Sequence, residues 1–108
     1  MNHNLTTADL LAGYTRDEWA GHGYLGERQS ALDTSDPDCP PRAAQVEAAD
    51  GWIVAEANRR GWTADQLFYW TNSKHGRWFA DAAFGGFGLD RAIREFNPEP
   101  ASWEWVYA

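Results

Sequence analysis

The chain has 108 residues, a net charge of −7 at pH 7 and a hydrophobic fraction of 44%. This composition excludes an intrinsically disordered chain and predicts one soluble globular domain over residues 1–108. No apolar run approaches the ~20 residues of a transmembrane helix, and the N-terminal residues lack a signal-peptide pattern. Cys39 is the single cysteine, which excludes an intramolecular disulfide. We therefore expect a cytoplasmic protein that does not bind membranes.

Three short segments share one pattern that is typical of helix starts. An apolar residue precedes a threonine, and an acid or glutamine three residues after the threonine is followed by another apolar residue. The pattern predicts helices capped by Thr6, Thr15 and Thr63. Gly13 is expected to end the first helix. The second is expected to be short because it meets three glycines, Gly21, Gly23 and Gly26.

The middle of the chain combines one loop with the longest predicted helix. Residues 33–41 are rich in Asp and Pro, which predicts a flexible loop. Residues 42–60 place apolar side chains on one helical stripe, and Gly61 is expected to end this helix. The stripe consists of Val46, Ala49, Ile53 and Ala57, and the side expected to face away carries Gln45, Glu47, Asp50 and Arg59.

The remaining sequence predicts three further helices and an aromatic tail. The helices start at Thr63, at Ser73 and, after the glycine-rich break at 84–88, at Leu89. In the last eight residues aromatic side chains alternate with others, but no second strand is predicted to pair with them. We predict an all-α, single compact domain of five or six short helices with an irregular aromatic C-terminal tail.

The chain contains seven tryptophans, which is more than a core of this size needs. Tryptophan is frequent in binding surfaces because its large apolar ring carries a polar N–H. Those with apolar neighbours at helical spacing are expected in the core, namely Trp52, Trp70 and Trp78. Trp103 and Trp105, with Tyr107 beside them, have no such local explanation. We expect these three to cover the core or to anchor a partner.

Residues 57–79 carry a net charge of +3 and lie between two acidic flanks. Within the predicted hairpin 42–73, the spacing of Ala57, Gly61 and Leu67 resembles the DNA-binding helix-turn-helix family. The resemblance covers about 20 residues and departs from the family pattern at Glu56 and Arg60, where apolar residues are usual. It implies DNA or RNA binding through Arg59, Arg60, Lys74, His75 and Arg77.

No pattern in the sequence predicts catalysis, a cofactor or a metal site. Glu18 and His22 stand four residues apart, but a metal site needs more ligands than these two. Gly85 to Gly88 lack the spacing of a dinucleotide-binding loop and are interpreted as a turn. We therefore expect a protein without enzymatic activity.

The leading hypothesis from the sequence is a small acidic binding protein that acts by protein–protein association. Because clustered carboxylates can occupy a surface meant for phosphates, one form is a phage-encoded inhibitor of a host defence or nucleic-acid-handling complex. Such a protein would be similar in general character to anti-CRISPR and anti-restriction proteins. The alternatives are the nucleic-acid binder described above and a phage structural or assembly protein. The candidate acids are Glu27, Asp33, Asp36, Asp38, Glu47, Asp50 and Glu56.

Overall fold

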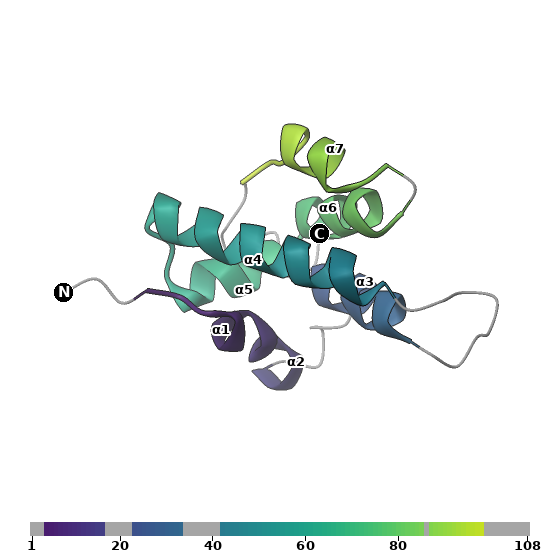
Figure 1. Cartoon of the computed structure of the whole chain (residues 1–108). Helices are drawn as coiled ribbons and strands as arrows, with labels where there is room; N and C mark the ends of the chain where they lie inside the picture. Colours follow the sequence, from purple (N-terminus) through teal and green to yellow (C-terminus); the bar gives the residue numbers. More distant parts are fainter. Residues whose placement is uncertain (1–3, 17–22, 34–41, 86, 99–108) are drawn as a thin grey trace.

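A computed structural model describes residues 4–16, 23–33, 42–85 and 87–98 of the chain. Within these ranges the chain forms seven helical segments and no β-strand (Figure 1). The segments are α1 (Thr7–Leu11), α2 (Gly13–Arg16), α3 (Tyr24–Leu32), α4 (Ala43–Arg60), α5 (Ala64–Thr71), α6 (Lys74–Phe84) and α7 (Leu89–Arg94). Only Ala12 separates α1 from α2. The predicted all-α class is confirmed, and most of the predicted loop 33–41 and the whole tail 101–108 lie outside the described residues.

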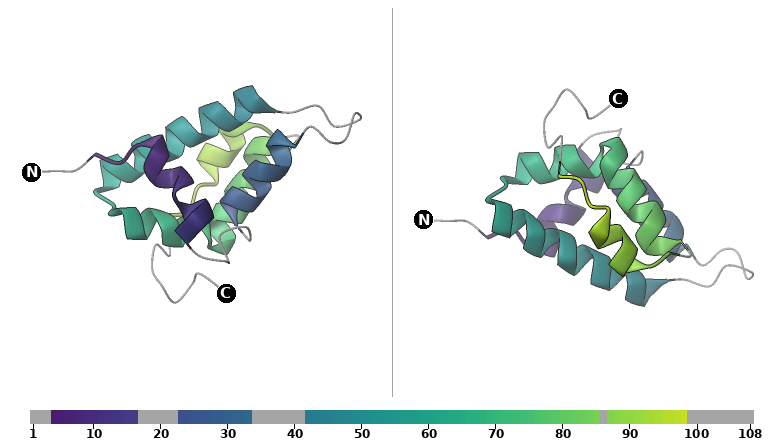
Figure 2. Two further views of the ribbon diagram at one scale, coloured as in Figure 1. Left: turned by 90° about the horizontal axis from the view of Figure 1, so that it is seen from below. Right: turned by 90° about the horizontal axis from the view of Figure 1, so that it is seen from above.

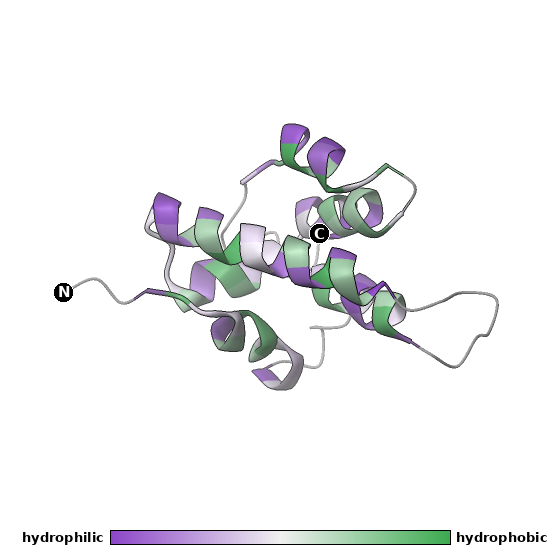
Figure 3. Ribbon diagram, in the orientation of Figure 1, coloured by the Kyte–Doolittle hydropathy of each residue, from purple (hydrophilic) through white to green (hydrophobic). Residues whose placement is uncertain are grey.

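Two helices organise the packing of the others. α4 packs against α1, α3, α6 and α7, and α6 packs against α3, α5 and α7 as well. Figure 2 shows α4 along one edge of the molecule, with α1 and α3 against it in the left view and α7 in the right view. Apolar and polar segments alternate along α4 in Figure 3, as an amphipathic helix requires.

Trp70 lies at the centre of the core and is fully buried. Its ring centroid is 5.3 Å from that of Phe96 and 5.7 Å from that of Phe79. The indole Nε1–H donates to the Asn97 carbonyl at 2.7 Å, so the one polar atom of the ring has a partner. Trp52 is half-buried and stacks on Phe79. The core predictions for Trp70 and Trp52 agree with these positions.

The prediction that Trp78 belongs to the core is wrong, because its side chain is 57% exposed. The buried stripe of α6 contains Gly76, Phe79, Ala80 and Ala83, at the spacing of one helical face. Trp78 stands one residue before Phe79, about 100° around the helix, and therefore points away from that stripe.

Several helix ends follow the local signals in the sequence. The Thr63 hydroxyl accepts from the Gln66 amide and the Gln66 side chain accepts from the Thr63 amide, which completes the predicted capping box. Ser73 accepts from the Gly76 amide at the start of α6. Gly61 ends α4 with a φ of 72°, a left-handed conformation that side chains with a Cβ avoid.

The predictions for residues 13–32 are wrong in two respects. Gly13 does not end the helical path, because it begins α2, buried at the contact with Leu25 and Phe68. Thr15 lies inside α2 and its hydroxyl donates to the Ala12 carbonyl, so it caps no helix start. In addition, the nine-residue helix α3 was not predicted from the sequence.

Candidate functional site

The acids predicted to bind a partner do not share one environment. Asp33 follows the last residue of α3 and is exposed, and Glu47 is exposed in the first half of α4. Asp36 and Asp38 lie outside the described residues, as do the predicted aromatic anchors Trp103, Trp105 and Tyr107. Of the seven candidate acids, Asp33 and Glu47 are thus placed on the surface, one just after α3 and one on α4.

The expectation that Asp50 faces away from the core is wrong. Asp50 is 4% exposed, accepts from the Tyr24 hydroxyl at 2.7 Å and pairs with Arg28 Nε at 2.9 Å. Burial, and then the nearby Asp50 carboxylate, raise the pKa of the Tyr24 hydroxyl. The reason for the burial is that α3 packs on α4 here and supplies both partners. Asp50 therefore contributes to the internal packing of the fold.

Glu56 is already paired within its own helix. Its carboxylate accepts from Arg60 Nε at 2.7 Å and from Arg59 Nε at 2.9 Å. The hydrogen bond from Arg59 is the main cause that lowers the pKa of the Glu56 carboxyl. The Arg60 guanidinium also lies 5.3 Å from the centroid of the Phe96 ring. Glu56, a candidate for protein binding, is thus paired with Arg59 and Arg60, which are candidates for nucleic-acid binding.

The other predicted nucleic-acid contacts lie on the first two turns of α6. Arg77 is exposed, and its Nε is 3.9 Å from a Glu27 carboxylate oxygen of α3. The Lys74 ammonium lies 5.7 Å from the centroid of the Trp78 ring. The His75 ring is edge-on to Trp78, and burial followed by the Lys74 charge lowers the pKa of the imidazole. This shift favours the neutral imidazole, so His75 contributes less positive charge than an unperturbed histidine would.

The α4–α5 hairpin has the predicted turn at Gly61, but an acid stands at the start of its second helix. Asp65, in the first turn of α5, is exposed and forms an ion pair with Arg16 of α2. In a helix-turn-helix protein the second helix enters the major groove with its N-terminal residues against the bases. A carboxylate there would lie close to DNA phosphates, which it repels.

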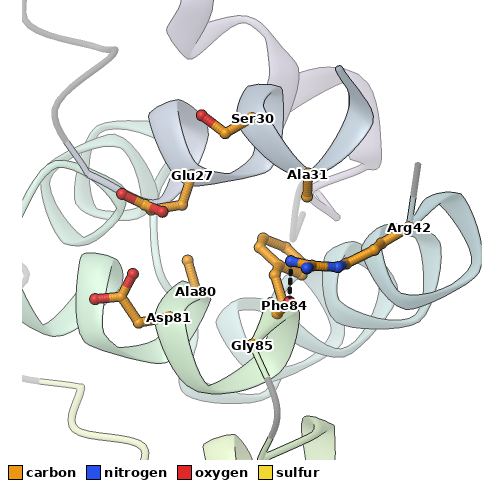
Figure 4. Close-up of a pocket in the computed structure, with 8 residues that line it drawn as sticks. All are labelled: Glu27, Ser30, Ala31, Arg42, Ala80, Asp81, Phe84 and Gly85. Carbon is orange, nitrogen blue, oxygen red and sulfur yellow. Dashed lines mark hydrogen bonds between the residues drawn. The ribbon is translucent and has the colours of Figure 1, made fainter. Parts of the chain in front are cut away.

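A small pocket between α3 and α6 was not predicted from the sequence (Figure 4). Glu27 and Asp81 lie on one side of it and Arg42 on the other, where Arg42 donates to the Phe84 carbonyl. Burial, and then the charge of Asp81, raise the pKa of Glu27. The pocket has a volume of about 230 Å³ and is below the usual range for ligand sites. No sequence signal links the two carboxylates, since 54 residues separate them.

The described residues expose two large aromatic rings, one on α6 and one in the loop that follows it. Trp78 is 57% exposed and Phe87 is 64% exposed, and they are the exposed large hydrophobic residues of this part of the chain. Each ring has a cation over it, because the Arg91 guanidinium lies 4.1 Å from the Phe87 centroid and Lys74 lies over Trp78. We call these four residues the aromatic surface.

The loop after α6, which carries Phe87, folds back onto the helix that carries Trp78. Trp78 stands one helical turn before Ala82, and the Gly88 amide donates to the Ala82 carbonyl at 3.0 Å. The loop that carries Phe87 therefore returns toward Trp78. Ala82 and Ala92 line a hollow between α6 and α7 beside the Trp78 ring. Small side chains on both helices leave this hollow open.

Comparison with known proteins gives no match to a family model, to a curated protein or to a solved structure. Among the described residues no helix is both long enough and apolar enough to cross a bilayer. In the same part of the chain, His, Cys, Asp and Glu do not gather in groups of three or more that could hold a metal ion. A function for this chain therefore has to be inferred from its own geometry.

Proposed function

We propose that this protein is a non-enzymatic binding protein that engages a partner protein through the aromatic surface. The exposure of Trp78 carries the proposal. The chain buries Trp70 fully and Trp52 partly. The Trp78 ring is exposed to water, although its helix α6 packs against α3, α4, α5 and α7. A large apolar ring left in water is available to a partner, and exposed apolar surface of this kind is typical of interaction sites.

The residue types of the aromatic surface support protein binding. Tryptophan and arginine are the residues most enriched among those that dominate the energy of interfaces, and both are present here as Trp78 and Arg91. The cations over the two rings favour the orientations in which cation and ring are in contact, which reduces the rotamer entropy lost on binding. We expect truncation of Trp78 to weaken the complex by about 2 kcal/mol or more.

The exposed acids support a narrower form of the same proposal, an inhibitor that presents carboxylates where a host complex binds phosphates. Asp33 and Glu47 are exposed, and the chain has a net charge of −7. In that form the aromatic surface supplies affinity and the carboxylates supply attraction to a basic partner. A phage-encoded inhibitor of a host defence complex is one protein of this kind.

The experiment is site-specific photo-crosslinking in a bacterial lysate. A photoreactive phenylalanine analogue replaces Phe87, and capture is repeated in the background of Trp78→Ala and, as a control, of Gln45→Ala, an exposed residue of α4. We expect one captured protein that is lost with Trp78→Ala and retained with Gln45→Ala. Circular dichroism verifies that both variants are folded.

Two results would contradict this proposal. Capture that is unchanged by Trp78→Ala would show that the ring is not an anchor. Self-association of the purified chain that disappears with Trp78→Ala would assign the surface to a second copy of the chain instead of a separate partner. Light scattering after size exclusion measures that self-association.

A further inference from the structure

We propose that a cleft between α1, α3 and α4 binds a ligand with an alkylammonium group, either a free amine or a lysine side chain. The cleft has a volume of about 450 Å³, within the range of small-molecule sites. α4 forms its floor with Val46, Glu47, Asp50 and Gly51, and its walls come from α1 and α3. Its lining shares no residue with the hollow beside Trp78, so the cleft is separate from the aromatic surface.

Gly51 is the first observation that points to a ligand. It stands in the middle of the 18-residue helix α4, where glycine costs about 1 kcal/mol relative to alanine. The packing of the fold does not require it, because an added Cβ would meet no atom within 4 Å and the residue has no positive φ. Gly51 lines the cleft, so any side chain at this position would reduce the space available to a ligand.

The polar groups of the cleft are the second observation. Arg28 and Asp50 form an ion pair at its base, with side chains 14% and 5% exposed. Burying an ion pair gives little net stability compared with an apolar pair of the same size. Its position at the bottom of an open cleft, instead of in a sealed core, leaves it within reach of a ligand.

The balance of charge selects the ligand. Asp50 is neutralised by Arg28, which leaves the exposed Glu47 carboxylate as the net charge of the lining. A cation is therefore favoured over an anion. Leu32 and Val46 provide apolar walls for a short aliphatic stem, and the Thr7 hydroxyl adds an acceptor for an ammonium N–H. An ammonium group on a four-carbon chain combines these properties.

The test is an NMR titration of the full chain labelled with ¹⁵N, in which backbone amides of α4 report binding. The probes are n-butylammonium, butyrate as its charge-reversed counterpart, and Nα-acetyl-lysine N-methylamide. We expect n-butylammonium to give saturable shifts at Gly51 and Glu47 with a dissociation constant of about 1–10 mM, as befits so small a ligand. Butyrate is expected to bind at least ~3-fold more weakly.

Two variants locate the site, and both are expected to fold. Gly51→Ala fills the floor and is expected to weaken n-butylammonium binding by about 10-fold while it raises the thermal midpoint of the protein. Glu47→Gln removes the net charge and is expected to weaken binding by about 3-fold. The matched controls are Gln45→Ala on α4 and Asp90→Asn on α7, which lie outside the lining and are expected to leave binding unchanged.

The lysine derivative separates the two sources of the ligand. Binding equal to that of n-butylammonium assigns the cleft to a lysine side chain of a peptide, and binding of the free amine alone assigns it to a small metabolite. Shifts that do not saturate, butyrate binding as tightly as the amine, or wild-type affinity in both variants would each overturn the proposal. None of these results bears on partner capture by Trp78.

Discussion

The buried contact between α3 and α4 gives the sharpest prediction about stability. Asp50→Ala removes the carboxylate that accepts from the Tyr24 hydroxyl and pairs with Arg28. Tyr24 is fully buried, so its hydroxyl cannot turn to bulk water. Among the described residues, the Arg28 guanidinium then keeps the Tyr14 hydroxyl, 3.3 Å from its Nη1, as its hydrogen-bond partner.

The expected loss of stability follows from the Tyr24 hydroxyl and the Arg28 guanidinium, which both lose their Asp50 partner. An unsatisfied buried hydroxyl costs about 1–3 kcal/mol, and removing one member of a buried ion pair costs about 3–5 kcal/mol. The Arg28 side chain is 14% exposed and recovers part of its hydration through the cleft, so the lower end applies. We expect Asp50→Ala to lower the free energy of unfolding by about 3–4 kcal/mol, a large share of the 5–15 kcal/mol that typical domains have.

Urea denaturation followed by circular dichroism measures this loss. With a slope of about 1.5 kcal/mol per M, the midpoint is expected to fall by about 2–3 M. A compensating variant tests the cause. Tyr24→Phe, Arg28→Met and Asp50→Leu together replace every polar member with an apolar one and are expected to restore stability to within about 1 kcal/mol of wild type. A loss below 1 kcal/mol for Asp50→Ala, or a triple variant less stable than the single one, would refute the reasoning.

Three further predictions concern helix capping, pH and nucleic acid. Thr63→Ala removes the N-cap hydroxyl of α5 and is expected to cost about 1 kcal/mol in urea denaturation, whereas Thr15→Ala, which removes no cap, costs less. Because the pKa of Glu27 is raised in the folded state, stability falls as pH rises from 4.5 through the folded pKa. Glu27→Gln is therefore expected to be more stable than wild type at pH 7 and to flatten that slope, and equal stability at pH 7 would show that the shift is absent. In fluorescence anisotropy at 50 mM salt we expect no saturable binding of single-stranded or duplex DNA, and binding abolished by Arg59→Glu with Arg60→Glu would favour the helix-turn-helix hypothesis instead.

The helix ends that sequence predicted well have all their partners within a few residues. Thr63 and Gln66 bind each other across three positions, and Ser73 reaches Gly76 in the same way. Gly61 needs only its own backbone conformation to end α4. Signals of this kind are complete in the local sequence, so no knowledge of the fold is required to interpret them.

The helix predictions for the N-terminal region are wrong where contacts between helices determine the secondary structure. Gly13 looks like a helix stop, but in the fold it allows α2 to approach Leu25 and Phe68 closely. The sequence does not predict α3 because its buried residues follow no clear helical period and because Gly26, inside the helix, disfavours helical structure. Tyr24 and Leu25 are nevertheless fully buried, so packing against other helices stabilises this segment.

The candidate sites are less predictable from the sequence than the fold is, because the type of a residue does not determine whether its side chain is exposed. Asp50 was expected outside and Trp78 inside, and the structure reverses both. Arg28, which makes the burial of Asp50 possible, is 22 residues away in the sequence. Nothing near Asp50 in the sequence indicates such a partner. Contacts between residues so far apart in the sequence can be identified only when the arrangement of the helices in space is known.

Because Trp70 is buried and Trp78 is exposed, the intrinsic fluorescence of the chain can report on the aromatic surface. Indole emission moves to longer wavelength in water, so Trp78 contributes at the red edge, where iodide quenches it, and Trp70 emits at the blue edge. The difference spectrum between wild type and Trp78→Phe isolates the outer ring. A molecule that covers Trp78 would shield this difference component from the quencher, so occupancy of the aromatic surface can be followed without an added dye.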